Sequence, residues 1–372
     1  MNVNDASEKL RVGVVGGGLI AQAVHLPNIA ASLRGALVAL ADPSAQVGEG
    51  LAVRYDIPAT YLDWQSMFES ERLDAVVVCS PHSTHAKIVL AAIELGIHCL
   101  VEKPLCIDPA DAVIIADRAD DAGVVVQVGY MKRYDPGFAS WVAALPESPE
   151  ELRLIDVTTF DPWMSRRPFV DWDNFIRGDD IGPQQLTQFR AEEAAQVGAA
   201  VGADDPDTVR AYSYTFLACL VHDVNLVAGA LDVWGLEARP ESSYVWAGGN
   251  AATITLSLEN GAIWRNTWLL LPEQQDFEEV ARVYFPGSIH ELTFPVPYHS
   301  QITTDHVVRG RGELGESLSV ERKFVSDSYV NELNAFFDAV HGKSTNLTPP
   351  SQAARDIRLL RELFRAKSPV GS

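Results

Sequence analysis

Cationic residues are scarce in this chain of 372 residues. Lysine and arginine together number 29 against 50 aspartates and glutamates, which gives a formal net charge of −21. Nucleic acids and anionic membrane surfaces are both polyanions, so a strongly acidic protein binds them poorly. We therefore expect neither nucleic acid nor a membrane among the partners of this protein.

Cysteine is also rare, and long apolar runs are missing. Cys79, Cys99, Cys106 and Cys219 form no C-x-x-C pair, so we expect buried thiols, no metal site and a reducing cytoplasmic location. The polar stretch Met1–Lys9 lacks a secretory apolar run, and no segment approaches the length of a membrane-spanning helix. We also find no internal repeat and no low-complexity tract.

Residues 11 to about 130 alternate between short apolar runs and amphipathic segments. Continuous apolar strands separated by helices are typical of a doubly wound parallel sheet, so we predict an α/β domain over residues 1–130. The expected strands are Val12–Val15, Leu37–Ala41, Ala75–Cys79, His98–Glu102 and Val124–Val128. The expected helices lie near Ile20–Leu33, Ser44–Tyr55, Asp63–Glu69, His85–Leu95 and Pro109–Ala122.

The pattern changes after residue 129, where consecutive antiparallel strands replace the alternation. Strands are expected at residues 150–160 and over Tyr244–Leu258, Ala262–Leu271, Val280–Phe285 and Ser288–Phe294. Asn260-Gly261 and Pro286-Gly287 are typical turn pairs between them. Helices are expected near Gln184–Ala200, Ser328–Val340 and Ser351–Ala366.

The most informative motif is G-G-G-L-I-A at residues 16–21, between the strand Val12–Val15 and a helix. It has the form G-x-G-x-x-A. Gly16 permits the tight turn, Gly18 lets a pyrophosphate approach the backbone, and Ala21 lets the helix pack on the strand. The helix N-terminus offers unpaired N–H groups to phosphates. Strand, turn, helix and a following acid together favour a dinucleotide site over an ordinary glycine turn.

That acid is Asp42, which ends the next strand. A carboxylate there accepts hydrogen bonds from the ribose hydroxyls and repels a 2′-phosphate. No arginine follows directly, because the next residues are P-S-A-Q. NAD is therefore favoured over NADP as the cofactor.

Polar residues also end the third and fourth predicted strands. The run S-P-H-S-T-H occupies residues 80–85, and Glu102-Lys103-Pro104 ends the next strand. Both lie at the carboxyl edge of the sheet, where open α/β folds bind ligands. A lysine at this edge could polarise a substrate oxygen or exchange a proton as hydride moves, and partial desolvation would lower its pKa. The alternative interpretation of Lys103 is a solvated surface side chain. A further candidate lies later in the chain, at His222, and its alternative interpretation is a buried, hydrogen-bonded histidine.

With these motifs the sequence resembles the glucose–fructose oxidoreductase, inositol dehydrogenase and MocA family. The resemblance is dense over residues 11–135 and loose over residues 217–365. The matching segments are G-G-G-L-I-A with His25-Leu26-Pro27, Ala41-Asp42-Pro43, residues 74–81 with His85, Glu102-Lys103-Pro104, Gly129 with Arg133-Tyr134, His222-Asp223, and residues 331–337 with Gly342.

The resemblance implies an N-terminal Rossmann domain and, over residues 131–372, an α/β domain with an open, mostly antiparallel sheet. In the family this sheet often forms an oligomer interface, so we expect a homodimer or homotetramer. The typical reaction is reversible NAD(P)-linked oxidation of a sugar, polyol or related hydroxyl. Lys103, often in a cis bond to Pro104, would orient cofactor and substrate, and His222 would be the general acid/base.

The expected site residues follow from the motifs and the resemblance together. Lys103 and His222 are the expected catalytic residues. The expected cofactor contacts are Gly16, Gly18, Leu19, Ile20, Asp42, Ser80, Pro81, His82, His85, Glu102 and Lys103. The expected substrate contacts are Lys103, Arg133, Trp163 and His222. His82 and His85 would shape the rim around the nicotinamide rather than carry protons.

One position departs from the family pattern. Many members carry an aspartate four residues before the histidine, on the same helix face, where it takes part in the proton relay; here that residue is Ala218. Asp223 points elsewhere on a helix, and Tyr214 reaches the site only if the helix begins early. Either His222 and Lys103 suffice, a residue of the insertion-like segment 163–216 helps, or the redox reaction is impaired.

Residues 163–216 lie outside the resemblance and have the character of an insertion. Trp163 and Trp172 stand near Asp171, Asp173 and Asn174, a mixture that suits a polyhydroxylated ligand. An equally good interpretation is a loop that covers the core or an oligomer contact. The acids would discourage an anionic substrate, whereas Arg166 and Arg167 would favour one.

The sequence is compatible with two functional hypotheses. The first is an NAD-dependent oxidoreductase acting on a hydroxyl of a carbohydrate-like molecule. The second, motivated by Ala218, is a dinucleotide-binding protein without net dehydrogenase activity, such as a sensor, a partner subunit or a protein that keeps NAD for non-redox chemistry.

Overall fold

Two β-sheets organise the computed structural model, which describes residues 9–162, 172–298, 302–312 and 314–366. The first sheet is parallel and has the strand order β3-β2-β1-β4-β5-β6. Its strands are β1 (Leu10–Val15), β2 (Gly35–Ala41), β3 (Ala59–Tyr61), β4 (Ala75–Val78), β5 (His98–Glu102) and β6 (Val126–Gly129). This is the order of a dinucleotide-binding sheet, in which ligands bind where the order reverses, beyond the ends of β1 and β4.

Short helices connect these strands. They are a π-helical turn (Ala21–His25) leading into α1 (Leu26–Ala31), then α2 (Ala45–Tyr55), α3 (Trp64–Ser70), α4 (His82–Glu94) and α5 (Pro109–Ala122). Side chains cap several of them: Ser44 accepts from the Val47 N–H at the start of α2, and Asp108 accepts from the Ala110 N–H at the start of α5. Gly123, with φ of 64°, ends α5.

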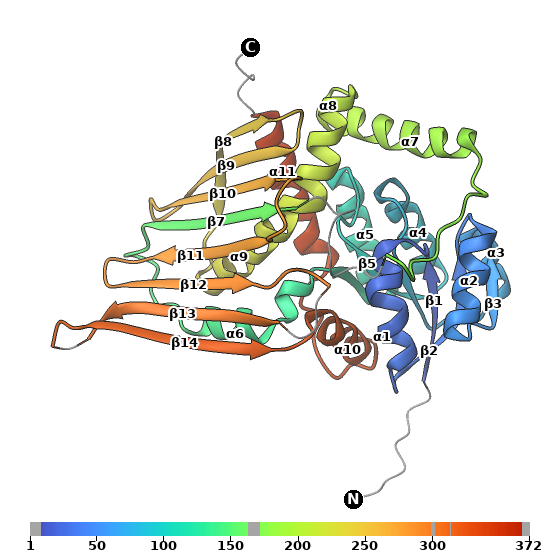
Figure 1. The fold of residues 1–372 in the computed structure, drawn as a ribbon, viewed down its shortest axis with the longest axis horizontal. Helices are drawn as coiled ribbons and strands as arrows, with labels where there is room; N and C mark the ends of the chain where they lie inside the picture. Colours follow the sequence, from blue (N-terminus) through green and yellow to red (C-terminus); the bar gives the residue numbers. More distant parts are fainter. Residues whose placement is uncertain (1–8, 163–171, 299–301, 313, 367–372) are drawn as a thin grey trace, which may run out of the picture.

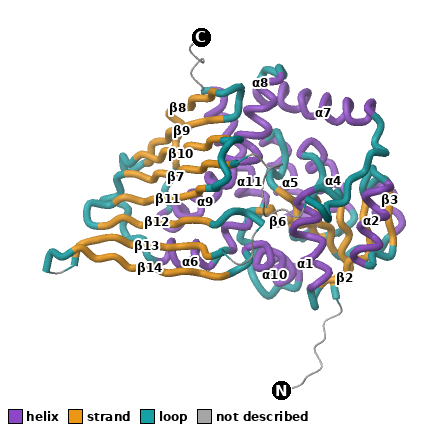
Figure 2. The backbone as a smooth tube through the Cα atoms, in the orientation of Figure 1, coloured by secondary structure: helices purple, strands orange, loops and turns teal. Residues whose placement is uncertain are grey.

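The second sheet has eight strands in the order β14-β13-β12-β11-β7-β10-β9-β8. They are β7 (Leu154–Asp161), β8 (Ala238–Trp246), β9 (Ala251–Leu258), β10 (Ile263–Leu270), β11 (Glu278–Tyr284), β12 (Ser288–Phe294), β13 (Thr303–Arg311) and β14 (Ser317–Val325). Among its described strands, only the β7–β10 pair is parallel. Helices gather on one face of this sheet, and its other face is open (Figures 1 and 2).

Helices also join the two sheets. The link from β6 to β7 contains the 3₁₀ turn Met131–Tyr134 and α6 (Pro136–Ala143). A second helical stretch, between β7 and β8 of the second sheet, contains α7 (Pro183–Val201), α8 (Pro206–Val209), the π-helix η4 (Arg210–Leu220) and α9 (Val221–Trp234). The continuous helical stretch Pro206–Trp234 is long and apolar enough to cross a membrane by length and composition, contrary to the expectation from the sequence. Two thirds of its most apolar window (67%) is buried inside the protein, as in a core helix.

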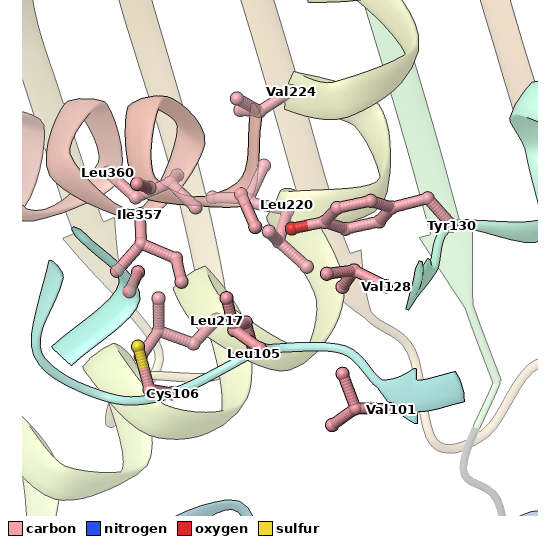
Figure 3. Packing of buried hydrophobic residues seen from close by; sticks show 14 of the residues in the cluster. Val101, Leu105, Cys106, Val128, Tyr130, Leu217, Leu220, Val224, Ile357 and Leu360 are labelled. Carbon is pink, nitrogen blue, oxygen red and sulfur yellow. The ribbon is translucent and has the colours of Figure 1, made fainter. Parts of the chain in front are cut away.

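One hydrophobic core connects the sheets and sets the position of η4. Leu105 and Cys106, just after β5, belong to the same buried cluster as Leu217 and Leu220 of η4 and Ile357 of α11 (Pro350–Arg365) (Figure 3). Each of these side chains is at most 1% exposed. Because the chain after β5 and η4 pack on each other, the residues at the end of β5 face the start of α9.

The C-terminal helices return to the parallel sheet. Leu333, Phe336 and Phe337 of α10 (Ser328–Val340) share a buried cluster with Val12 and Val14 of β1. Phe337 lies so close to Gly35 that a Cβ there would come within 2.8 Å of its ring. The last part of the chain therefore completes the core of the first domain.

The predicted α/β class, with one parallel and one mostly antiparallel sheet, is confirmed. The single predicted strand Tyr244–Leu258 is wrong, because the turn at Gly248 and Gly249, with φ of 60° and 79°, divides it into β8 and β9. The predicted sheet also lacked β3, β13 and β14. Strand β3 has only three residues, too few to show a pattern, and β14 is exposed at almost every position, so it adds little to the core. The insertion-like segment does not end at a structural boundary, because residue 216 lies inside η4.

Candidate active site

The glycine motif forms a tight loop between β1 and the first helical turn. Gly16 has φ of +96°, and a Cβ there would lie 2.8 Å from the backbone of Cys79. A Cβ on Gly18 would meet nothing within 4 Å. The loop therefore leaves open space beside Gly18 at the helix N-terminus, the place where glycine loops of this type hold a pyrophosphate.

Asp42 lies beside this loop at the end of β2. Its Oδ2 accepts a hydrogen bond from the Gly17 N–H at 2.7 Å, and its Oδ1 accepts one from the Ser44 N–H at 2.9 Å. Burial raises the pKa of the Asp42 carboxyl above its ordinary value, while these two N–H groups act in the opposite direction. Each carboxylate oxygen has a second lone pair, so both can also accept from ribose hydroxyls.

A cavity of about 610 Å³ lies between the two sheets. Leu19 and Ile20 line it on the side of the glycine loop, and Lys103 lines it at the end of β5. The opposite side is lined by residues of β7, η4, α9, β10 and β11, and by residues near the start of α10. The expected site residues that line this cavity are Leu19, Ile20, Ser80, His82, His85, Glu102, Lys103 and His222.

Lys103 reaches across to the helix on the far side of the cavity. Its Nζ donates to the backbone carbonyl of Ala218 at 2.8 Å, and the Lys103–Pro104 peptide bond is cis. Burial lowers the pKa of Lys103, although the charge of Glu102 acts in the opposite direction. The ammonium is therefore held at a defined place and gives up its proton more readily than an exposed lysine.

Glu102 supports the end of β5 through a buried pair. The His25 Nε2 lies 2.8 Å from Glu102 Oε1, and both side chains are less than a tenth exposed. Burial alone would raise the pKa of Glu102, but the hydrogen bond and charge of His25, with Lys103, hold it below its ordinary value. Glu102 thus connects the first helical turn to the strand that carries Lys103.

His222 stands one helical turn beyond Ala218 and lines the same cavity. Its Nδ1 is buried and has no hydrogen-bond partner among the described residues. Burial, with the charges of Lys103 and Lys132, holds the pKa of His222 well below its ordinary value of 6.5. The imidazole is therefore neutral at neutral pH. Tyr214 lines the cavity as well, because the helix begins at Pro206, early enough to bring it there.

The π-helical form of η4 changes which residues share a face. A π-helix is rare, bonds i to i+5 and is found frequently at functional sites. It ends at Leu220, so the step from Ala218 to His222 crosses from π-helical to α-helical winding. Both side chains nevertheless line the cavity, and Ala218 brings no proton-carrying group to it.

A buried charged triad forms another wall of the cavity. Lys132 contacts Glu279 of β11 directly, and its Nζ lies 3.3 Å from Asp223 Oδ1. Asp223 Oδ2 also accepts from Thr159 at 3.1 Å and from Asn266 at 3.0 Å. Burial and the Asp223 charge raise the pKa of Glu279 to about 8. One ammonium and two carboxyl groups thus face a single cavity.

Two histidines lie at the end of β4. His85 Nδ1 is 2.8 Å from the Pro104 carbonyl oxygen, and its Nε2 is 2.8 Å from that of Ser80. The His82 ring packs edge-on against it at 5.8 Å. Burial lowers the pKa of both rings. His85 thereby connects the loops that follow β4 and β5.

Some expected site residues lie elsewhere. Arg133 was expected to contact substrate, but its guanidinium faces the Asn225 carbonyl and Gln352, each at 3.3 Å, and it stacks over Phe138. The preceding residue, Lys132, lines the cavity instead. Gly16, Gly18, Asp42 and Pro81 are outside the cavity lining. Four of the residues singled out in the insertion-like segment fall outside the described residues: Trp163, Arg166, Arg167 and Asp171. Within the described part of the chain, no group of three or more His, Cys, Asp or Glu side chains could hold a metal ion.

Several cavity residues were not anticipated from the sequence. They are Thr159, Asp161, Trp268, Glu279, Tyr298 and Tyr329. Glu279, Trp268 and Thr159 lie on neighbouring strands of the second sheet, and their inward orientation depends on strand register. The sequence does offer one signal for such residues. Asn266 is a polar residue between Trp264 and Trp268 on the same face of a strand, which indicates that this face lines a polar site.

Comparison with known proteins agrees with this geometry. Residues 10–130 match the family described as an oxidoreductase family with an NAD-binding Rossmann fold. Over 136 residues the chain is 38% identical to inositol 2-dehydrogenase 4 of Saccharopolyspora erythraea, covering 36% of this chain and 40% of that protein. Over 132 residues it is 33% identical to scyllo-inositol 2-dehydrogenase (NAD(+)) of Bacillus subtilis, covering 35% and 38%. The matched region therefore spans about two fifths of these relatives.

Similarity of fold extends over the whole chain. A crystal structure of a mutant 3-ketoreductase from Actinomadura kijaniata, in complex with TDP-benzene and NADP, has a TM-score of 0.71 with this structure. The match covers 97% of this chain and 98% of that chain at 15% identity, so it concerns the fold alone. Residues 10–130 therefore match the glucose–fructose oxidoreductase, inositol dehydrogenase and MocA (Gfo/Idh/MocA) family, and the whole chain has the fold of solved structures such as this ketoreductase.

Proposed function

We propose that this protein is an NAD(P)-dependent oxidoreductase that interconverts a hydroxyl and a keto group on a sugar, cyclic polyol or related small molecule. The observation that carries the proposal is the single cavity lined by Lys103 and His222 next to the helix that follows the glycine loop. When bound, the nicotinamide supplies the hydride acceptor or donor.

Lys103 and His222 divide the proton handling in this proposal. In the direction of oxidation, the Lys103 ammonium donates a hydrogen bond to the reacting oxygen and the neutral His222 imidazole takes up the hydroxyl proton. The Ala218 carbonyl holds Lys103 Nζ in position before substrate binds. In the reverse direction, the protonated His222 imidazole returns its proton to the carbonyl oxygen while Lys103 donates its hydrogen bond to the same oxygen.

The walls of the cavity suit a polyhydroxylated substrate. Trp268 and Tyr298 offer aromatic surface, and Lys132, Glu279 and Asp161 offer polar groups that can form hydrogen bonds with hydroxyls. The relatives described above are named inositol dehydrogenases, which supports this substrate class. Trp163 remains a predicted substrate contact.

The second hypothesis, a dinucleotide-binding protein without net dehydrogenase activity, gains no support from the named relatives. Its motive was Ala218, and the cavity supplies other ionisable groups, Glu279 and Lys132, on the wall next to His222. NAD is the proposed cofactor, with NADP less favoured. The buried thiols of Cys79, Cys99 and Cys106 fit the proposed reducing cytoplasmic location.

We also propose that two or four copies assemble through the open face of the second sheet. On β10 the side chains alternate, so that Trp264, Asn266 and Trp268 are buried while Ile263 and Arg265 are exposed on that face. We expect Thr267→Lys on this face to lower the mass measured by light scattering, and Val233→Lys, on the exposed side of α9, to leave it unchanged. A monomeric wild-type protein would contradict this assembly.

The test of the proposed activity combines binding and turnover. The purified protein is titrated with NADH and NADPH, and then incubated with NAD or NADP and a panel of inositols, monosaccharides and glycosides while absorbance at the reduced-nicotinamide band is followed. We expect dinucleotide binding and reduction of the cofactor with at least one polyol. A protein that binds neither dinucleotide would refute the proposal.

A further inference from the structure

Residues 174–180 lie against the Rossmann domain and contact residues that are more than 100 positions earlier in the sequence. The Gln22 side chain donates to the Ile176 carbonyl at 2.9 Å and accepts from the Ile176 N–H at 2.9 Å. The same amide donates to the Gly17 carbonyl at 2.7 Å. Arg54 of α2 donates to the Asn174 carbonyl at 2.5 Å. This segment is thus fixed to the helix that follows the glycine loop and to α2.

The contact continues to the N-terminus of α2. The Gln46 amide donates to Asp179 Oδ1 at 2.8 Å and accepts from the Asp179 N–H at 3.1 Å. A Cβ on Gly178 would come within 2.0 Å of Ser44 Oγ, so the backbone passes directly over Ser44. The Gln46 amide therefore binds both the side chain and the backbone of Asp179, which fixes residues 178–180 against the start of α2.

Asp180 ends this contact at the first turn of α2. Its Oδ1 accepts a hydrogen bond from the Ser44 hydroxyl, and its Oδ2 accepts one from the Gln46 N–H at 3.1 Å. The free N–H groups and the positive dipole end of a helix N-terminus bind anions, including phosphate. In this structure a carboxylate from the insertion-like segment takes those donors.

The position matters because it adjoins the ribose end of the dinucleotide site. Asp42 lies two residues before Ser44 and faces the 2′- and 3′-hydroxyls in a site of this type. A 2′-phosphate would be placed beside it, next to the Ser44 hydroxyl and the first N–H groups of α2. There it would find those donors occupied and the carboxylates of Asp42, Asp179 and Asp180 nearby.

We propose that Asp180 occupies the anion site at the start of α2 that a 2′-phosphate would use, and that the segment 174–180 thereby selects NAD against NADP. The inference rests on the proposed dinucleotide function and deepens it by adding a specificity-determining residue from outside the Rossmann domain. Ser44 and Gln46 hold Asp180 in place, and Ile176 and Asp179 hold the segment.

The experiment measures binding, independent of turnover. NADH, NADPH and adenosine 2′-monophosphate are titrated by calorimetry into the wild-type protein, Asp180→Ala and the control Asp204→Ala. Asp204 is an exposed carboxylate beyond the end of α7, near Gly198, so its substitution changes the net charge equally. Asp180→Asn, which keeps the shape, serves if the alanine variant does not fold by circular dichroism.

In the wild-type protein we expect tighter binding of NADH than of NADPH. In Asp180→Ala the affinities for NADPH and for adenosine 2′-monophosphate should rise roughly tenfold, because one like charge is removed and two donors are released. The NADH affinity should change little, and Asp204→Ala should match wild type. Asp180→Asn should shift the same ratio in the same direction by a smaller factor.

Two outcomes would overturn the inference while leaving the proposed function intact. One is a wild-type protein that binds NADPH as tightly as NADH. The other is an Asp180 variant whose ratio of NADH to NADPH affinity equals that of Asp204→Ala. A wild-type protein that binds no dinucleotide would instead remove the proposed function on which the inference rests.

Discussion

Restoring a carboxylate at residue 218 should change the protonation of His222. Ala218 and His222 line one cavity, and His222 Nδ1 is buried with no partner among the described residues. Burial and the charges of Lys103 and Lys132 hold its pKa well below 6.5. An aspartate in Ala218→Asp would add a negative charge next to two cations and an unpaired imidazole nitrogen, and so it should stabilise the imidazolium.

The size of this effect follows from the spacing of the two positions. Side chains four residues apart on a helix have Cβ atoms about 5–6 Å apart. At that separation, with an effective dielectric constant of about 20, two unit charges interact by about 3 kcal/mol. The proton affinity of His222 should therefore rise about a hundredfold in Ala218→Asp. The acid limb of the kcat/KM profile should move to higher pH, because the neutral imidazole is the proton acceptor in oxidation.

The assay is an NMR titration of the His222 ring proton, assigned by its loss in His222→Gln. Ala218→Asn is the matched control, because it has nearly the same shape and no charge. We expect His222 to titrate at clearly higher pH in the aspartate variant than in the asparagine variant. Equal titration in both variants would show that residue 218 does not face His222 closely enough to act on it.

Three further predictions follow from the same geometry. Lys103→Ala should lower kcat by about 10²–10⁴-fold with little change in NADH affinity. Lys103→Arg should restore little activity, since a guanidinium keeps its proton. Unaltered turnover in the alanine variant would show that Lys103 is a surface side chain with no catalytic role. Gly16→Ala should destabilise the fold by about 1–3 kcal/mol in denaturant titrations, because Gly16 has φ of +96° and a Cβ there would meet backbone atoms. Gly18→Ala should leave the stability unchanged and weaken NADH binding, because a Cβ there meets only open space. An equal loss of stability in both variants would contradict this prediction. Because the pKa of His222 in the folded protein lies well below its unfolded value of 6.5, the unfolded state binds the additional proton, so stability is complete above pH 6.5 and falls as the pH drops below it. His222→Gln should reduce this acid sensitivity by up to about 1.4 kcal/mol per pH unit below 6.5, measured by urea unfolding at several pH values, and an unchanged pH dependence would count against a buried neutral imidazole.

Local motifs predicted the parts of the site that lie at strand ends. The glycine loop, Asp42 and Lys103 are each adjacent in sequence to a buried parallel strand, and parallel strands bring their carboxyl ends to one edge. His222 could be placed by its family position, whereas Tyr214 was placed only on the condition that its helix begins early, which the structure shows. These inferences needed only the order of strands and helices.

The charged triad could not be predicted in this way. Lys132, Asp223 and Glu279 come from a 3₁₀ turn, a helix and a strand, and they meet only because β11 pairs with β7 in one register. A shift by one residue would turn Glu279 to the open face of the sheet. Lys132 was not anticipated either, since the sequence does not show which of two adjacent cations, Lys132 or Arg133, a short turn directs inward.

The return of α10 to the parallel sheet has a consequence for how the protein is made. Phe336 and Phe337 pack with Val12 and Val14 of β1, so part of the first domain's core comes from the last tenth of the chain or so. During synthesis, β1 and the glycine loop leave the ribosome long before those aromatic rings exist. The core of the first domain is therefore incomplete, with Val12 and Val14 only partly covered, until translation is nearly finished. A nascent chain stalled before residue 328 should then need chaperone protection, although every strand of its parallel sheet has already been synthesised.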